Sequence, residues 1–181
     1  MPLRGLNQNE SESDMTDQFD MFEGEGAFLE KMRHNWKTSI EKKGAICPCC
    51  DRFGKVNMFR FTQTWAISLK WMFDHQGQDG WANLQKGAPR IVLRGKNYSM
   101  IANWGLIESQ SNRSGVWRLT QQGKDFIAGN IYIPVKLFTY NNKPWGFSAE
   151  QTSFRGCFGK HFDFDEMMSD QFKWANLQEK K

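Results

Sequence analysis

Apolar side chains recur at helical spacing in the segment that begins near residue 62. Positions i, i+4, i+7 and i+8 of this segment carry Trp65, Leu69, Met72 and Phe73. This spacing predicts a three-turn helix with one apolar face. Thr62 or Thr64 is suited to cap its N-terminus, because a threonine hydroxyl accepts a hydrogen bond from the first turn. The segment 75–77 closes the helix.

Residues 80–130 alternate short apolar segments with glycine and proline. Their pattern predicts, in order, a strand over 80–85, helix over 90–93, turn at 94–95, helix over 96–104, strands over 106–108 and 116–119, and helix over 120–127. Pro89 suits the first position of a helix, and Gly105 and Gly129 stand where glycine commonly ends one. This is the element order of a winged helix-turn-helix. The sequence therefore predicts an α+β fold with a winged helix-turn-helix core.

The flanking segments carry weaker patterns. Residues 1–26 are polar and acidic without sustained periodicity, which is typical of a disordered arm. An amphipathic helix is predicted from near Gly26 to residue 42 by apolar side chains at helical spacing, namely Phe28, Leu29, Met32 and Trp36. Beyond the core, the pattern predicts a strand over 131–140, a turn over 141–144, a returning strand over 145–148 and a helix over 162–168. Pro134 favours a sheet edge for the first of these strands.

The predicted organisation has four parts. They are an acidic, disordered arm over 1–26, an amphipathic helix with a cysteine knuckle over 27–61, a winged helix-turn-helix over 62–130, and a β-hairpin with a C-terminal helix over 131–181 packed on the core.

Composition narrows the class of protein. Hydrophobic residues make up 39% of the 181 residues, which excludes global disorder. No apolar run approaches the roughly 20 residues of a membrane span, and the first residues lack the apolar core of a secretory signal. We therefore expect a cytoplasmic protein without a membrane partner.

The net charge of +4 is unevenly distributed. Residues 1–30 hold eight acids against Arg4 alone, a balance of −7, and the rest of the chain holds 23 bases against 12 acids, a balance of +11. A basic body with an acidic arm indicates a polyanionic partner for the body. The alternative is a solvated surface with a solubilising tail.

In a winged helix the second helix of the pair enters the major groove and the wing contacts the DNA backbone. If Tyr98, Ile101 and Trp104 face the core, other side chains of the helix over 96–104 point outward. The candidate nucleic-acid-binding residues of this region are Arg90, Arg94, Lys96, Ser99 and Asn103, with Arg113 and Arg118 on the wing. The alternative is that the same positions serve protein recognition.

The segment KVNMFR over 55–60 mixes bases with apolar and aromatic side chains, as single-strand binders do. Lys55 and Arg60 are its candidate phosphate contacts. The alternative is a β-strand with Phe59 and Phe61 on its core side.

Three of the four cysteines lie within four residues. Cys47 and Cys50 have the spacing of a zinc knuckle, which supplies two of the four ligands of a tetrahedral site. The remaining ligands could come from Cys49 and His34, or from Cys157 and His161. The alternative is a metal-free turn with free thiols.

No catalytic constellation is apparent, and we expect a protein that is not an enzyme. Asp163, Asp165 and Glu166 could hold a divalent metal for nuclease-like chemistry, but acids are also favoured in the first turn of a helix. The pentapeptide WANLQ occurs at 81–85 and again at 174–178. The second copy could compete for the sheet edge that the first one uses or pair with another subunit, and the alternative is a coincidence.

Several segments resemble small, mostly uncharacterised proteins of tailed bacteriophages, in which a CPxCG-type knuckle precedes a winged helix. The matching segments are CPCCDRFGKV (47–56), GWANLQ (80–85), APRIVLRGKNYSMIANWGLIES (88–109), VWRLTQQGKDFIAG (116–129) and YNNKPWGF (140–147). Asp51 stands where the knuckle usually has glycine. The resemblance implies a phage early or accessory protein and supplies no activity.

These observations predict a nucleic-acid-binding accessory protein that recruits or modulates replication or transcription machinery. The expected ligand is DNA, with duplex, single-stranded and melted forms left open, and the acidic arm is the expected contact for a polymerase, host or defence protein. The alternative is a phage inhibitor that binds a host or defence protein without nucleic acid. A continuous basic face would favour the first, and an exposed aromatic patch the second. The sequence does not predict an oligomeric state.

Overall fold

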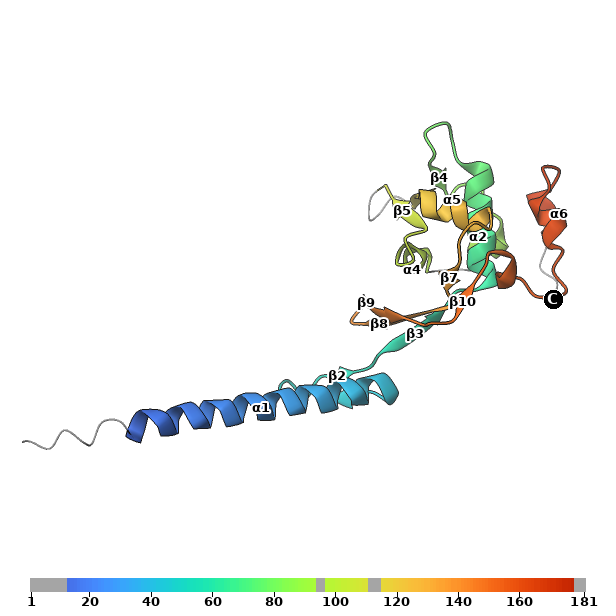
Figure 1. Ribbon diagram of the computed structural model, residues 1–181. Coiled ribbons are helices and arrows are strands. Elements are labelled where there is room, and N and C mark those ends of the chain that lie inside the picture. The colour runs from blue at the N-terminus through green and yellow to red at the C-terminus, as the bar shows by residue number, and fades with distance from the viewer. Residues whose placement is uncertain (1–12, 94–96, 111–114, 178–181) are drawn as a thin grey trace, which may run out of the picture. The chain divides into compact units, whose positions relative to one another are not determined.

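The computed structural model describes residues 13–93, 97–110 and 115–177 (Figure 1). Helices and strands are mixed along the chain, which confirms the α+β class. The chain divides into two compact units, 1–56 and 57–181. Within the described ranges, no helix has both the length and the apolar character needed to cross a membrane.

The first unit contains one long helix and a small hairpin. The helix is α1 (Ser13–Lys42), and the hairpin pairs β1 (Ala45–Ile46) with β2 (Phe53–Gly54) in antiparallel register. In Figure 1 the hairpin lies beside the C-terminal part of α1, and the Val56 N–H donates to the Ile40 carbonyl at 3.0 Å. Ile40 is fully buried.

The start of α1 differs from the prediction. We expected the helix to begin near Gly26 and the segment before it to be disordered, but the helix begins at Ser13. Residues 13–26 lack apolar periodicity, yet they contain only two glycines among ordinary helix formers. Each glycine costs about 1 kcal/mol, and extending an existing helix needs no new nucleus. The remainder of the expected arm, 1–12, lies outside the described residues.

The second unit contains the helices and strands predicted for residues 62–130. They are α2 (Gln63–His75), β4 (Ala82–Asn83), α3 (Arg90–Leu93), α4 (Tyr98–Ala102), β5 (Ile107–Ser109), β6 (Val116–Leu119) and α5 (Gln121–Ile127). The three strands form an antiparallel sheet in the order β4-β6-β5.

Threonine hydroxyls cap two helices, and Thr62 is one of the two candidates predicted for α2. The Thr62 hydroxyl accepts from the Trp65 N–H at the start of α2, and the Thr120 hydroxyl accepts from the Gly123 N–H at the start of α5. The prediction of which side of α2 is buried was wrong in one respect. The whole of 65–72 is buried, whereas Phe73, predicted on the apolar face, is 40% exposed. Neighbouring elements therefore cover α2 on more than one side, and its pattern is not that of a half-exposed surface helix.

Helix α4 is shorter than the predicted 96–104. It ends at Ala102, and the chain turns through Asn103 and Trp104 to Gly105, whose φ of 71° is left-handed. Trp104 is buried, and its indole N–H donates to the Pro134 carbonyl at 2.7 Å. This tertiary contact ends the helix one turn before the glycine.

The rest of the second unit forms a second sheet and a short ribbon. The sheet has the order β3-β8-β9, built from β3 (Asn57–Arg60), β8 (Lys136–Tyr140) and β9 (Lys143–Phe147). The ribbon pairs β7 (Ile133–Pro134) with β10 (Gln151–Thr152), so Pro134 lies in a two-stranded pair and not in the larger sheet. Asn141 and Asn142 both adopt positive φ in the turn between β8 and β9. Asparagine tolerates this conformation in tight hairpins.

The two sheets and the helices of the second unit share one hydrophobic core. At its centre the Phe61 ring makes edge-to-face contacts with Trp65, Trp104 and Phe126 at 5.5–5.7 Å. Residues 131–181 add Ile133, Leu137, Phe154 and Met167 to the same core. The last elements are the 3-10 turns η1 (Arg155–Cys157) and η2 (Trp174–Asn176), with α6 (Phe164–Met168) between them.

Candidate nucleic-acid interface

Of the nucleic-acid-binding residues predicted for the central region, some lie within the described residues and others do not. Arg94, Lys96 and Arg113 lie outside the described residues. Arg90 in α3 and Ser99 in α4 are exposed to solvent. Asn103 is half-buried, and its amide N–H donates to Met100 Sδ at 3.8 Å. The described part of this surface therefore presents one arginine and one serine.

The inward face of α4 agrees with the prediction. Ile101 and Trp104 are buried, and the half-buried Tyr98 donates its hydroxyl hydrogen to the Val92 carbonyl. Burial raises the pKa of Tyr98 to about 12, so the phenol remains a donor at neutral pH. This bond links α4 to α3.

Arg118 has a structural role that its position on the wing did not predict. It forms an ion pair with Glu108, which lies directly opposite on β5. Its guanidinium also lies 4.7 Å from the centre of the Trp81 ring. Arg118 therefore bridges the strands of the first sheet, and a phosphate would have to compete with Glu108 for it.

The second sheet presents a different basic surface. Leu137 and Thr139 of β8 are buried, so strand alternation directs Lys136, Phe138 and Tyr140 to the opposite face. Met58 and Arg60 lie directly opposite Phe138 and Lys136 in the antiparallel register. Both β3 residues are exposed, and Met58 has 55% of its surface accessible.

Strand β9 extends this surface. Lys143 lies opposite Tyr140, and Trp145 occupies the irregular step of the β8–β9 register, with its ring 5.7 Å from that of Tyr140. Trp145 is 40% exposed. We name the outer sheet face by its residues, Met58, Arg60, Lys136, Phe138, Tyr140, Lys143 and Trp145. It combines three bases with aromatic and apolar side chains.

One acidic side chain adjoins the outer sheet face. Glu150 lies 3.8 Å from the Lys136 ammonium, with 58% of its side chain exposed. An exposed pair at this distance contributes little energy, so it leaves Lys136 available to another anion.

The segment KVNMFR over 55–60 therefore has features of both interpretations that the sequence allowed. Phe59 is half-buried and Phe61 is buried in the core, as the strand interpretation required. Arg60 faces outward on β3, as phosphate contact requires. Lys55, which is exposed, belongs to the first unit. Sequence reasoning missed the β8 and β9 contributions, although the alternation over 136–140 was a usable signal.

The cysteine knuckle occupies the tip of the β1–β2 hairpin. The Cys47 N–H donates to the Arg52 carbonyl at 2.8 Å, and the Asp51 N–H donates to the Cys47 carbonyl at 2.9 Å. The nearby backbone N–H groups of Cys49 and Cys50 lower the pKa of the Cys47 thiol. Asp51 adopts a φ of 56°, the left-handed conformation for which glycine is usual at this position. This turn fits a knuckle whose first sulfur serves as a thiolate ligand.

Of the additional ligands predicted for zinc, Cys49 is exposed within the knuckle turn and His34 lies on α1. Met32, Trp36 and Ile40 form the shielded face of α1, whereas His34 is exposed on the opposite side of that helix. Cys157 lies in the second unit, half-buried against the core, and its thiol donates to the Ser153 carbonyl at 3.4 Å. His161 is exposed. Across the described ranges, no group of three or more histidine, cysteine or acidic side chains is placed to hold a metal ion.

Asp163 and Asp165 have structural roles at the start of α6, which was the alternative to metal binding. The Asp163 carboxylate accepts from the Glu166 N–H at 2.9 Å and caps α6. Asp165 lies in the first turn and pairs with Arg155 at 2.9 Å.

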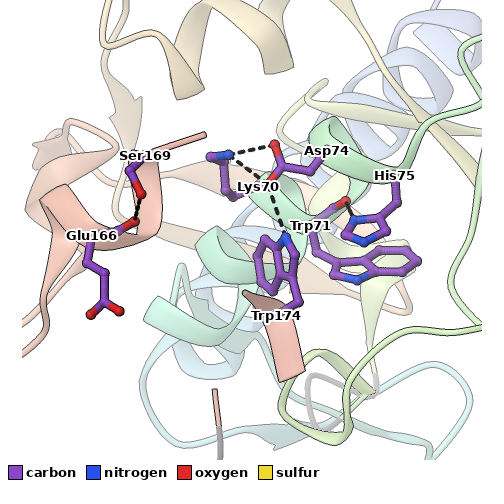
Figure 2. Close-up of polar contacts among 7 residues, drawn as sticks. All are labelled: Lys70, Trp71, Asp74, His75, Glu166, Ser169 and Trp174. Carbon is purple, nitrogen blue, oxygen red and sulfur yellow. Dashed lines mark hydrogen bonds and ion pairs between the residues drawn. The ribbon is translucent and has the colours of Figure 1, made fainter. Parts of the chain in front are cut away.

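A polar cluster joins α2 to the C-terminal segment (Figure 2). The Lys70 ammonium contacts both carboxylate oxygens of Asp74, at 2.5 and 2.7 Å, although its side chain is only 8% exposed. Trp174, in the second WANLQ copy, donates its indole N–H to Asp74 at 3.1 Å. That copy forms the 3-10 turn η2 and not a strand that competes for the edge used by the first copy.

The buried Cys157 thiol leads to a pH-dependent prediction. Burial raises its pKa from 9.0 to about 11. The unfolded chain therefore loses this proton at lower pH than the folded chain does. The thiol's contribution to stability is complete below pH 9 and is lost as the pH rises to about 11, a change on the order of 2 kcal/mol. Denaturant titrations of the wild type and Cys157→Ser between pH 8 and 11 measure it. Parallel pH dependences of the two proteins would contradict the assignment.

No family model, curated protein or solved structure matches the chain.

Proposed function

We propose that the protein is a non-enzymatic nucleic-acid-binding accessory protein, of the kind that tailed bacteriophages encode, and that it binds single-stranded or melted DNA through the outer sheet face. One observation carries this proposal: Arg60, Lys136 and Lys143 share a face with Tyr140, Trp145, Phe138 and Met58. Bases on such a face contact phosphates, and flat side chains stack on unpaired bases. The protein would act on replication or transcription machinery at that DNA.

We also propose that α2 to α5 form a winged helix-turn-helix. The helix and strand order supports this, as does the sheet order β4-β6-β5, in which the last strand lies between the other two. In that arrangement α4 is the recognition helix, with Ser99 as its described outward residue, and Arg90 lies on the preceding helix α3. Duplex next to a melted site could bind there while the single strand binds the outer sheet face.

A second candidate function is binding of a host or defence protein by the same surface. The exposure of Met58 (55%) and Trp145 (40%) favours it, because apolar side chains gathered on one face of a sheet often mark protein contacts. The two functions differ in their dependence on salt. Neutralised phosphates release counterions, whereas an apolar protein contact is nearly insensitive to salt.

The test uses the Arg60→Gln/Lys143→Gln double variant with a fluorescent oligothymidylate. We expect its affinity to fall at least tenfold at low salt. The slope of log K against log salt should become shallower by about 1.4, since each single-strand phosphate contributes about 0.7. Trp145→Ala should lose about 1–3 kcal/mol of binding free energy with an unchanged slope, because stacking carries no charge. Fluorescence anisotropy at several salt concentrations measures both changes.

Lys124→Gln is the matched control. Lys124 is exposed on α5, away from the outer sheet face, so its loss changes the net charge without touching the proposed site. Equal losses from Lys124→Gln and from either single substitution would contradict a localised site. Wild-type protein that binds no oligonucleotide at low salt would favour the protein-binding function.

A further inference from the structure

The knuckle is half of a metal site within one chain. Zinc prefers four ligands in tetrahedral geometry, and a Cys-x-x-Cys turn supplies two. Among the described residues of the first unit, no group of three or more histidine, cysteine or acidic side chains is placed to hold a metal ion. His34 faces away on α1, and Cys157 is packed against the core of the other unit.

The turn is nevertheless built in the form that a bound metal requires. Cys47 and Cys50 stand at the two ends of one tight turn at the tip of the β1–β2 hairpin. The hydrogen bonds from the Cys47 N–H to the Arg52 carbonyl and from the Asp51 N–H to the Cys47 carbonyl fix the loop, and the left-handed Asp51 completes it. These contacts hold the loop that carries Cys47 and Cys50.

The surface beside the knuckle is apolar and open to solvent. Ile46 and Phe53 are direct cross-strand partners at its base, and they are 63% and 67% exposed. Large apolar side chains with this exposure on a two-stranded hairpin are costly to leave in water. Phe53 also covers Gly44, where a Cβ atom would lie 2.3 Å from the ring, so this side chain has a fixed place.

We propose that two copies of the chain share one zinc ion, each contributing Cys47 and Cys50, and that Ile46 and Phe53 of the two copies pack together beside it. A second copy is the occupant that supplies the two missing ligands and an apolar surface of the same kind. A twofold axis through the metal gives both chains identical contacts, as in a closed dimer. The four sulfurs complete a tetrahedral, all-cysteine site of the structural type.

The test measures mass and metal content together on the full chain, without a histidine tag and with a non-thiol reductant present. We expect a dimer with about 0.5 zinc per chain, and native mass spectrometry should show two chains with one zinc. A chelator should yield monomers, and added zinc but not magnesium should restore the dimer. Cys47→Ser and Cys50→Ser should be metal-free monomers, while Cys49→Ser should keep both zinc and dimer.

A further variant preserves every cysteine. Ile46→Glu should weaken the dimer at least tenfold, because two carboxylates would meet across the axis. Phe28→Ser, at a similarly exposed position on α1 (62%), should not weaken it. A monomer with one tightly bound zinc would overturn the proposal, as would a dimer that persists without zinc or a dimer lost on reduction alone. Equal zinc loss from all three cysteine variants would indicate a three-cysteine site in one chain and would also overturn it.

Discussion

Asp74→Ala is expected to lower the free energy of unfolding by about 3–5 kcal/mol, the cost of leaving a buried charge without its partner. The Lys70 side chain is 8% exposed, and both carboxylate oxygens of Asp74 contact its ammonium. Removing the carboxylate also deprives the Trp174 indole N–H of its acceptor. The loss should therefore exceed that of an exposed i,i+4 pair, about 0.5 kcal/mol. Denaturant unfolding followed by tryptophan fluorescence measures it.

The variant Lys70→Met tests the same ion pair by removing the ammonium in place of the carboxylate. Methionine fills much of the same volume and needs no counter-charge, so this variant should lie within about 1.5 kcal/mol of the wild type. Adding Lys70→Met to Asp74→Ala should then recover most of the lost stability. If the double variant is as unstable as Asp74→Ala alone, the loss comes from the Trp174 contact and not from the unpaired ammonium.

Gly123→Ala is expected to destabilise the second unit by several kcal/mol, although alanine favours a helix by about 1 kcal/mol over glycine. Gly123 lies in α5, and a Cβ atom there would stand 2.1 Å from the Leu106 carbonyl oxygen. The backbone on that side cannot easily move. The Thr120 N–H donates to the Leu106 carbonyl at 3.1 Å, and the Thr120 hydroxyl donates to the Gly105 carbonyl at 2.5 Å.

Two further alanine variants serve as controls for Gly123→Ala. Lys124→Ala changes the next, exposed position of α5 and should alter stability by less than about 0.5 kcal/mol. Gly159→Ala places its new Cβ in open space without a positive φ, and it should be neutral or slightly stabilising. A melting temperature for Gly123→Ala equal to that of Lys124→Ala would show that α5 shifts away from β5 at little cost.

Features determined by neighbouring residues were predicted well. The cap at Thr62, one of the two predicted candidates, depends on a hydroxyl and an N–H three residues apart. The turn at Asn141 and Asn142 depends on the conformations that asparagine tolerates. In these cases the residues that cause the structure lie within one turn of each other, so a single segment of sequence contains the information.

Features that depend on distant partners were missed. The outer sheet face exists because β3 pairs with β8, almost 80 residues later, and a one-residue change of register would turn Arg60 toward the core. Arg118 was predicted as a phosphate contact because of its position on the wing, but it pairs with Glu108 and lies over the Trp81 ring. The early end of α4 follows from the contact of Trp104 with Pro134, 30 residues away. Local periodicity contains none of these pairings.

The two WANLQ copies give the chain an internal reference for amide hydrogen exchange. The first copy contributes β4, where the Leu84 N–H donates to the Gly115 carbonyl, and in the second the Leu177 N–H donates to the Trp174 carbonyl in η2. Corresponding interior amides have the same side-chain neighbours, so their intrinsic exchange chemistry is the same. The ratio of their rates therefore reports only the difference in opening free energy between sheet and 3-10 turn, in one molecule under one set of conditions.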